Sequence, residues 1–265
     1  MSFPPLAVLH ADDALAVVDK PAGLMVHDSA LARGETDFAA DRLREQFGKP
    51  IFLVHRLDRA TSGCLLLAFD RATASALGKM MMARGAGDVA AQNMACENEA
   101  GEKSAGDNGP IEKPAFEKDY WAVCRGWPDE HLLVDHDLDG GPGKPVKKTA
   151  ITRFTRLATT ELAMPSAGFE TSRYALLKAQ PETGRFRQIR RHLKHLSHHL
   201  IGDTSHGDGR HNRAFRMLGV HRMLLHARRL AFVHPGTGLR VDVDAPVDAE
   251  FAKALALFAD APAAP

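Results

Sequence analysis

A short charged stretch between two apolar runs holds the residues best suited to chemistry. His55, Arg56 and Asp58 lie between the apolar segments 51–54 and 64–69, each of which predicts a buried strand. If the chain is extended there, the two-residue spacing places the Arg56 and Asp58 side chains on one face. A carboxylate presented between two strands is a candidate nucleophile or general base. The alternative is an ordinary charged surface loop, because Asp and Arg are mostly exposed in proteins.

The net charge of +1 conceals a strongly basic segment. Residues 185–229 contain 11 Lys or Arg against two acidic residues, Asp203 and Asp208, and they hold eight of the 14 His. A positive face on a nearly neutral protein favours a polyanionic partner that is held by its phosphates. A solvated helix face is the alternative that charge alone leaves open.

Size and composition are those of a globular protein. The 265 residues, 45% hydrophobic and 25% charged, suffice for one large domain or two small ones. We expect no signal peptide, and no apolar run approaches the roughly 18 residues of a membrane span. Cys64, Cys96 and Cys124 lack Cys-x-x-Cys spacing, which argues against a disulfide framework or a zinc knuckle. We therefore expect a cytoplasmic protein that does not contact a membrane.

Periodicity and turn residues predict a mixture of strands and helices. The expected strands lie at 6–9, 14–18, 119–126, 150–157 and 173–180. Thr36 is the expected N-cap of a helix that ends at Gly48, and Asp70 caps a second helix that ends near Met82. Thr183 is the expected cap of a third helix, within the basic segment.

The third helix also carries histidines whose spacing could suit a metal ion. His192, His195 and His198 follow one another at intervals of three, an arrangement that a metal-dependent hydrolase could use. However, no nearby pair of carboxylates completes such a site, and Glu is absent from residues 183–248. The sequence therefore favours a protein without a metal.

Residues 85–112 differ in kind from the rest of the chain. They contain no aromatic residue, five Gly, and six acidic residues against the single Lys103. Such a segment cannot bury enough apolar surface to offset the entropy of ordering it, so we expect a disordered insertion. A tolerated loop extension explains it better than a functional role.

The charged stretch resembles a known signature. His55-Arg56-Leu57-Asp58, followed by Thr61-Ser62-Gly63, is similar to the catalytic motif of the RluA-type pseudouridine synthases. Other stretches resemble the same family: Lys20-Pro21-Ala22-Gly23, Lys118-Asp119-Tyr120, Gly143-Lys144-Pro145, Thr183-Gly184-Arg185, Ile201-Gly202-Asp203 and Leu224-Leu225-His226-Ala227. The chain departs from the family at Asp19, where Asn is usual, and at Arg187, where His is usual. The matches run from residue 17 to about residue 235.

The resemblance implies a fold and an activity. The expected fold is α+β, a single catalytic domain over residues 1–265 with a long mixed, largely antiparallel sheet, flanking helices and a central cleft. The activity is isomerisation of uridine to pseudouridine in RNA, without a cofactor or a metal. Asp58 would be the catalytic carboxylate, Arg190 the cation beside it, and Tyr120 would stack on the uracil. Arg56 would fill the space left by the extruded base.

The resemblance also bears on the RNA. The other basic residues expected to bind RNA are Lys147, Lys148, Arg191, Lys194, Arg210 and Arg213. The basic runs 190–193 and 206–213 look most like the branch of the family that modifies tRNA, so uridine 65 of tRNA is the expected target. A ribosomal RNA target and a non-catalytic RNA-binding protein are the alternatives. The oligomeric state is open, with a monomer favoured.

Overall fold

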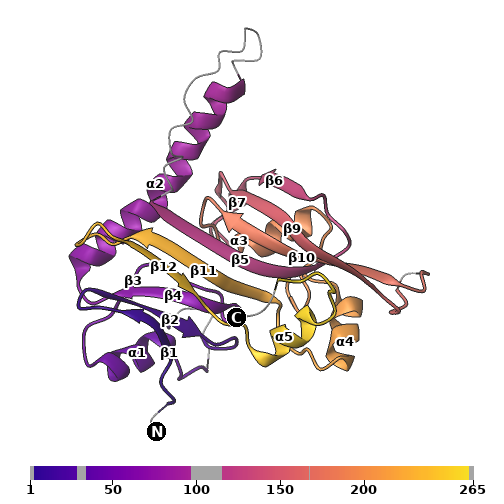
Figure 1. The fold of residues 1–265 in the computed structure, drawn as a ribbon, viewed down its shortest axis with the longest axis horizontal. Helices are drawn as coiled ribbons and strands as arrows, with labels where there is room; N and C mark the ends of the chain where they lie inside the picture. Colours follow the sequence, from indigo (N-terminus) through magenta and orange to yellow (C-terminus); the bar gives the residue numbers. More distant parts are fainter. Residues whose placement is uncertain (1–2, 29–33, 97–114, 167, 263–265) are drawn as a thin grey trace.

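A ten-stranded mixed sheet forms the centre of the molecule (Figure 1). The computed structural model describes residues 3–28, 34–96, 115–166 and 168–262. The strands of the large sheet are β1 (Ala7–Ala11), β2 (Leu15–Lys20), β3 (Phe52–Leu53), β4 (Ser62–Ala68), β5 (Phe116–Arg125), β6 (His131–Asp135), β9 (Ile151–Leu162), β10 (Ser172–Pro181), β11 (Leu225–Val233) and β12 (Arg240–Asp244). Two further strands, β7 (Leu138–Asp139) and β8 (Lys147–Lys148), form a small hairpin of their own. The helices are α1 (Ala39–Phe47), α2 (Arg71–Cys96), α3 (Gln188–His195), α4 (Gly209–Met217) and α5 (Ala249–Leu255).

The sheet has one parallel seam near its middle. Its strand order is β1-β2-β4-β11-β5-β10-β9-β6, and the described pairs are antiparallel except for β4 with β11. That parallel pairing covers two positions, His226 opposite Ser62 and Ala227 opposite Gly63. Beyond them the two strands diverge, so that β3 pairs with the end of β4 and β12 with the end of β11. The expected α+β fold with a largely antiparallel sheet is therefore confirmed.

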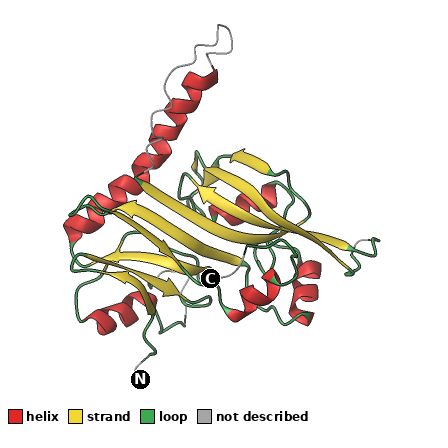
Figure 2. Cartoon of the chain, viewed as in Figure 1, coloured by secondary structure: helices red, strands yellow, loops and turns green. Residues whose placement is uncertain are grey.

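Helices cover both faces of the central strands (Figure 2). On one face, Ile189 of α3 packs with Ala122 of β5. On the other, Phe215 of α4 and Phe251 of α5 pack with Trp121. Because neighbouring residues of a strand point to opposite faces, α3 lies on one side of β5, and α4 and α5 lie on the other. The helix α1 covers the N-terminal strands, where its Leu43 is fully buried.

Two helices begin later than their expected caps. The backbone N–H groups of Ala39 and Ala40 are bonded, at 2.8 and 2.9 Å, to carbonyls of Met25 and Val26. The residues before α1 are thereby held extended, and the helix starts at Ala39 instead of after Thr36. In the same way α3 starts at Gln188, because Arg187 before it adopts a left-handed conformation with φ 52°.

The helix α2 is longer than the sequence predicts. It begins after Asp70, whose carboxylate accepts a 2.8 Å hydrogen bond from the Thr73 backbone as expected for a cap, but it continues to Cys96. Residues 85–96 of the expected disordered insertion are thus helical backbone, and residues 97–112 lie outside the described part of the chain. Figure 1 shows α2 extending away from the sheet. Within the described residues, no helix has the length and apolar character needed to cross a membrane.

Candidate active site

A cleft of about 760 Å³ opens on the face of the sheet that carries α3. Its walls come from the loop before β4, from β5, from the middle of α2 and from the segment that leads into α3. Its polar and aromatic lining includes His55, Arg56, Asp58, Lys118, Tyr120, Glu182, Arg185, Phe186, Arg187, Gln188 and Arg190. Segments that are far apart in sequence therefore contribute ionisable groups to one concave site, which is the usual setting for chemistry.

The Asp58 carboxylate is bonded to Arg190 across this cleft. The Arg190 Nη1 atom donates to Asp58 Oδ2 at 2.7 Å, although the two residues are 132 positions apart. The Arg190 side chain is 7% exposed, and that of Asp58 is 27% exposed, enough for a substrate to reach it. The contact that was expected between these side chains is therefore present.

Asp203 fixes the other edge of the Arg190 guanidinium. Nε and Nη2 of Arg190 donate to the two Asp203 oxygens at 2.7 and 2.8 Å, and Asp203 also accepts from the backbone of Ser205 and His206. Burial raises the pKa of Asp203, but the hydrogen bonds and charge of Arg190 outweigh it, so the pKa lies below its ordinary value. Asp203 thus leaves Arg190 one free edge, which points at Asp58. The sequence placed Asp203 in a family motif without assigning it this contact.

The turn that carries Asp58 is anchored to the Lys-Pro-x-Gly turn. The fully buried Lys20 Nζ donates to the carbonyls of Pro21, Leu24 and Arg59, at 2.7, 2.8 and 3.3 Å. Burial and the nearby charge of Arg222 lower the pKa of Lys20 to about 7, although Asp58 acts in the opposite direction. The Lys20 side chain therefore holds together two turns that are separated by almost 40 residues.

Tyr120 faces the cleft from β5. Tyr120 and Lys118 both line the cleft, as alternate residues of a strand should when one face is exposed to it. Burial raises the pKa of the Tyr120 phenol well above its ordinary value, with further contributions from Cys64 and Asp58. The hydroxyl therefore keeps its proton at physiological pH and can donate it to a hydrogen bond.

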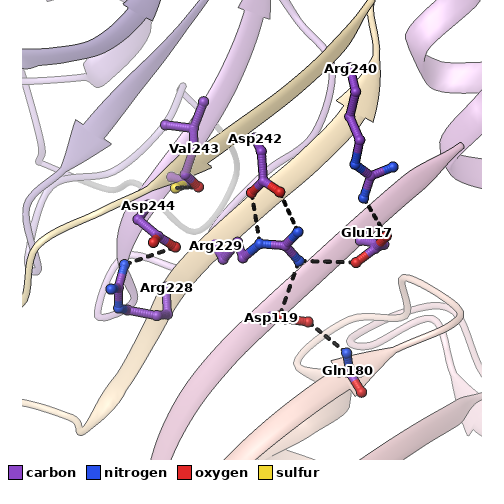
Figure 3. Close-up of polar contacts among 10 residues, drawn as sticks. Glu117, Asp119, Gln180, Arg228, Arg229, Arg240, Asp242, Val243 and Asp244 are labelled. Atoms are coloured by element: carbon purple, nitrogen blue, oxygen red, sulfur yellow. Dashed lines mark hydrogen bonds and ion pairs between the residues drawn. The ribbon is translucent and has the colours of Figure 1, made fainter. Parts of the chain in front are cut away.

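The opposite face of β5 is fixed by ion pairs (Figure 3). Arg229 of β11 bonds to Asp242 of β12 at 2.7 Å and to Glu117 of β5 at 3.0 Å. Asp119 accepts a 2.7 Å hydrogen bond from Gln180 of β10. These contacts join four strands directly behind the cleft, so they help to fix the position of Tyr120.

The residues expected to bind RNA occupy different environments. Of this set, Arg56 lines the cleft, where it is exposed. Arg191 is instead bonded to the side chain and the carbonyl of Asp139, both at 3.0 Å, and so fixes the β7–β8 hairpin beside the cleft. The remaining residues are exposed outside the cleft: Lys147, Lys148, Lys194, Arg210 and Arg213. Arg185 and Arg187 line the cleft, and their position in the basic segment was the signal that could have identified them.

The histidines of α3 have structural partners. His192 is fully buried, with Nδ1 3.0 Å from Thr152 Oγ1 and Nε2 3.2 Å from the His136 carbonyl oxygen. Burial lowers its pKa to about 4. His195 stacks on His136 with ring centroids 3.9 Å apart. Within the part of the chain that the structure describes, no three His, Cys, Asp or Glu are grouped as metal ligands.

Comparisons with known proteins identify the family of this chain. The family model described as RNA pseudouridylate synthase matches residues 14–89 and 108–195. A relative from Vibrio parahaemolyticus serotype O3:K6, tRNA pseudouridine synthase C, is 36% identical over 253 residues, 92% of this chain and 91% of its own length. The protein of the same name from Haemophilus influenzae is 34% identical over 263 residues, 96% of this chain and 98% of its own length.

A solved structure shares the fold. Human RNA Pseudouridylate Synthase Domain Containing 4 aligns with a TM-score of 0.65 and 22% identity, covering 95% of this chain and 92% of that one. The family match over residues 14–89 and 108–195, with the relatives above, confirms the resemblance that the motifs suggested. The chain belongs to the RNA pseudouridylate synthase family.

Proposed function

We propose that this chain isomerises one uridine of a folded tRNA to pseudouridine, with Asp58 as its catalytic carboxylate. The observation that supports this most is the accessible Asp58 side chain, held at 2.7 Å by an Arg190 that Asp203 fixes from behind. The guanidinium of Arg190 thus places a positive charge in direct contact with this carboxylate.

The reaction exchanges one bond between base and sugar for another. The bond from uracil N1 to C1′ breaks, the ring turns over, and a bond from C5 to C1′ forms. The proton on C5 is lost, and N1 gains one. A carboxylate at Asp58 can add to an electron-poor carbon or accept the C5 proton, and either role suits its place in the cleft.

Tyr120 is proposed to act on the detached uracil. Its ring lines the same cleft as Asp58, from strand β5, where it can stack on the base. Because its hydroxyl stays protonated, it can orient a uracil oxygen by donating a hydrogen bond while the ring turns over.

The uridine must leave its helix to reach Asp58. Extruding a paired base costs a few kcal/mol, and the exposed Arg56 at the cleft is proposed to take the vacated place in the stack. Arg185 and Arg187 lie at the same cleft and are added to the proposed RNA contacts. The exposed cations outside it are proposed to hold phosphates: Lys147, Lys148, Lys194, Arg210 and Arg213. Arg191 would contribute to RNA binding indirectly, because it fixes the position of the β7–β8 hairpin.

The choice of tRNA rests on the named relatives. Several tRNA pseudouridine synthase C proteins match almost the whole chain at 34–37% identity. We infer that the target is uridine 65 of tRNA, and that the protein acts as a monomer in the cytoplasm. A ribosomal RNA uridine is the second candidate.

Tritium release tests the proposal directly. Unmodified tRNA with tritium at uracil C5 should release it to water with the wild-type protein and with Asp129→Ala, which removes an exposed carboxylate outside the cleft. Asp58→Ala should release none while binding the tRNA within about twofold of wild type. Equal release by Asp58→Ala would refute its catalytic role. If changing uridine 65 to cytidine leaves the release unchanged, position 65 is not the target.

A further inference from the structure

We propose that Ser62, His226 and Arg222 form a hydrogen-bonded relay that positions the Asp58 turn from helix α5. The proposal rests on the catalytic role assigned to Asp58. It concerns residues that line no part of the cleft. Ser62 and His226 lie opposite each other in the parallel seam of the sheet, and Arg222 donates to Ser62.

Ser62 is the point where the Asp58 turn enters the sheet. The turn is closed by a 3.0 Å hydrogen bond from the Thr61 backbone N–H to the Asp58 carbonyl, and Ser62 is the next residue and the first of β4. Ser62 is 3% exposed. Its hydroxyl lies 2.7 Å from Nδ1 of His226 and 2.8 Å from Nη2 of Arg222.

The direction of each hydrogen bond in this relay is determined. Nε2 of His226 is 3.1 Å from the Ala245 carbonyl oxygen, which can only accept, so Nε2 carries the proton. The neutral ring therefore accepts at Nδ1 from the Ser62 hydroxyl. The guanidinium of Arg222 can only donate, so the Ser62 oxygen accepts from it. Every polar atom has a partner in one arrangement, which gives Ser62 a single orientation.

Burial keeps this arrangement in place. His226 is 1% exposed, and desolvation lowers its pKa to about 4, so the ring stays neutral across the physiological range. A protonated ring would carry a hydrogen on Nδ1 and could no longer accept from Ser62. The relay is thus stable to ordinary changes of pH.

Arg222 connects the relay to helix α5 and to the cleft. Its side chain is 9% exposed and pairs with Asp248, the residue that caps α5 by accepting a 2.9 Å hydrogen bond from the Phe251 backbone. Its Nη2 atom also donates to the Leu225 carbonyl at 3.1 Å, and Leu225 lines the cleft. Figure 1 shows α5 beside the start of β11, where Leu225 lies. One guanidinium therefore links α5, the start of β11 and the end of the Asp58 turn.

The relay matters because Asp58 and Arg190 come from the two sides of the seam. The seam is only two residue pairs long, so backbone pairing between β4 and β11 alone joins its two sides weakly. A shift of the Asp58 carboxylate by about 1 Å can cost roughly 100-fold in rate. Ser62, His226 and Arg222 are accordingly positioning residues, which act through Asp58 and do not touch the RNA.

Single-turnover kinetics with saturating tRNA test the relay. Ser62→Ala and Arg222→Lys should each slow pseudouridine formation by roughly 10- to 100-fold, while the tRNA Kd stays within about twofold. Asp248→Asn keeps a capping oxygen for α5 but removes the ion pair with Arg222. It should therefore slow the reaction less than Ser62→Ala or Arg222→Lys does. Glu250→Gln, also on α5, is the control. It keeps an acceptor for the His221 backbone N–H and should react at the wild-type rate.

The double variant separates positioning from general destabilisation. If Arg222 acts through Ser62, the Ser62→Ala/Arg222→Lys double variant should be no slower than its slower parent, because both changes break one relay. The proposal would be overturned if the double variant were slowed by the product of the two single rate reductions. It would also be overturned if the folded single variants reacted at the wild-type rate. All rates are taken well below each variant's Tm. Absence of pseudouridine with the wild-type protein would instead count against the proposed function itself.

Discussion

Gly63 lies so close to Ala227 that a Cβ atom on Gly63 would be 2.3 Å from the Ala227 carbonyl oxygen. The two residues face each other at the parallel seam between β4 and β11. The backbone of Gly63 also has φ +103°, a conformation that residues other than glycine rarely adopt. The seam behind the active site therefore requires glycine for two independent reasons.

We expect Gly63→Ala to destabilise the protein by about 3 kcal/mol or more, because the strands must separate to admit the methyl group. Gly48→Ala is the matched control, since Gly48 has φ +61° but nothing within 4 Å of an added Cβ. It should cost only about 1 kcal/mol. Chemical denaturation of the two variants measures the difference, and equal losses would show that the close approach to Ala227 costs nothing.

Arg190→Met should abolish turnover far more than it weakens RNA binding. The change removes the donor to Asp58 and leaves Asp203 buried without its cation, so a lower Tm is expected as well. Arg44→Met, which removes an exposed cation on α1 outside the cleft, is the control and should affect turnover and tRNA binding little. The measurement is tritium release beside tRNA binding, both below the Tm of the variant. Comparable losses in the two would make Arg190 a phosphate contact instead.

Asp19→Asn should make the protein more stable at pH 7. Burial and the charge of Asp248 raise the pKa of Asp19 to about 6 from its ordinary 3.8. As pH rises from about 4 to about 6, the unfolded chain loses this proton before the folded one does, so stability falls across that window. Asn carries no such penalty and should gain roughly 1 to 2 kcal/mol at pH 7.

Denaturation at pH 4.5 and pH 7 measures this difference for Asp19. The advantage of the Asn variant should grow as pH rises between these values and then level off above about pH 6. Asp13→Asn, an exposed change on the same hairpin, serves as the control. A constant difference between Asp19→Asn and wild type at the two pH values would contradict the raised pKa.

Neutralising Arg210 and Arg213 should weaken the salt dependence of tRNA binding. Both side chains are exposed on α4, and each phosphate contact contributes about 0.9 to the slope of log K against log salt in a duplex. The double Gln variant should therefore lower the slope by roughly 2. Arg44→Gln, exposed on the distant helix α1, should leave it unchanged. An identical slope for wild type and the double variant would exclude α4 from the interface.

The sequence predicted the site better than it predicted the ends of the helices. The Asp58 motif, the strands β1 and β2 and the Asp58–Arg190 contact were all predicted, the last through resemblance and not through spacing. The start of α1 was wrong because tertiary contacts displaced it: backbone bonds to Met25 and Val26 hold the chain extended before α1. The start of α3 was wrong because Arg187 adopts a left-handed conformation. Local cap preferences contain no information about such partners.

Contacts over long sequence distances account for the rest of what was missed. Asp203 is recognised as a partner of Arg190 only once its two oxygens are seen facing the guanidinium. The link from Ser62 to His226 spans 164 residues, and no periodicity or motif spacing reports it.

The insertion was expected from composition, but composition does not reveal that its first part would continue α2 to Cys96.

The central place of β11 also has a consequence for biogenesis. Because β11 lies between β4 and β5, the growing polypeptide cannot complete the middle of the sheet until about 230 residues have left the ribosome. The strand β4, which follows the Asp58 turn, must wait for β11 before it can pair on that side. Contacts between residues far apart in sequence therefore dominate, and we expect slow folding. Release of a prematurely terminated chain before β11 would yield a protein that carries Asp58, Tyr120 and Arg190 and still does not bring them together in one cleft.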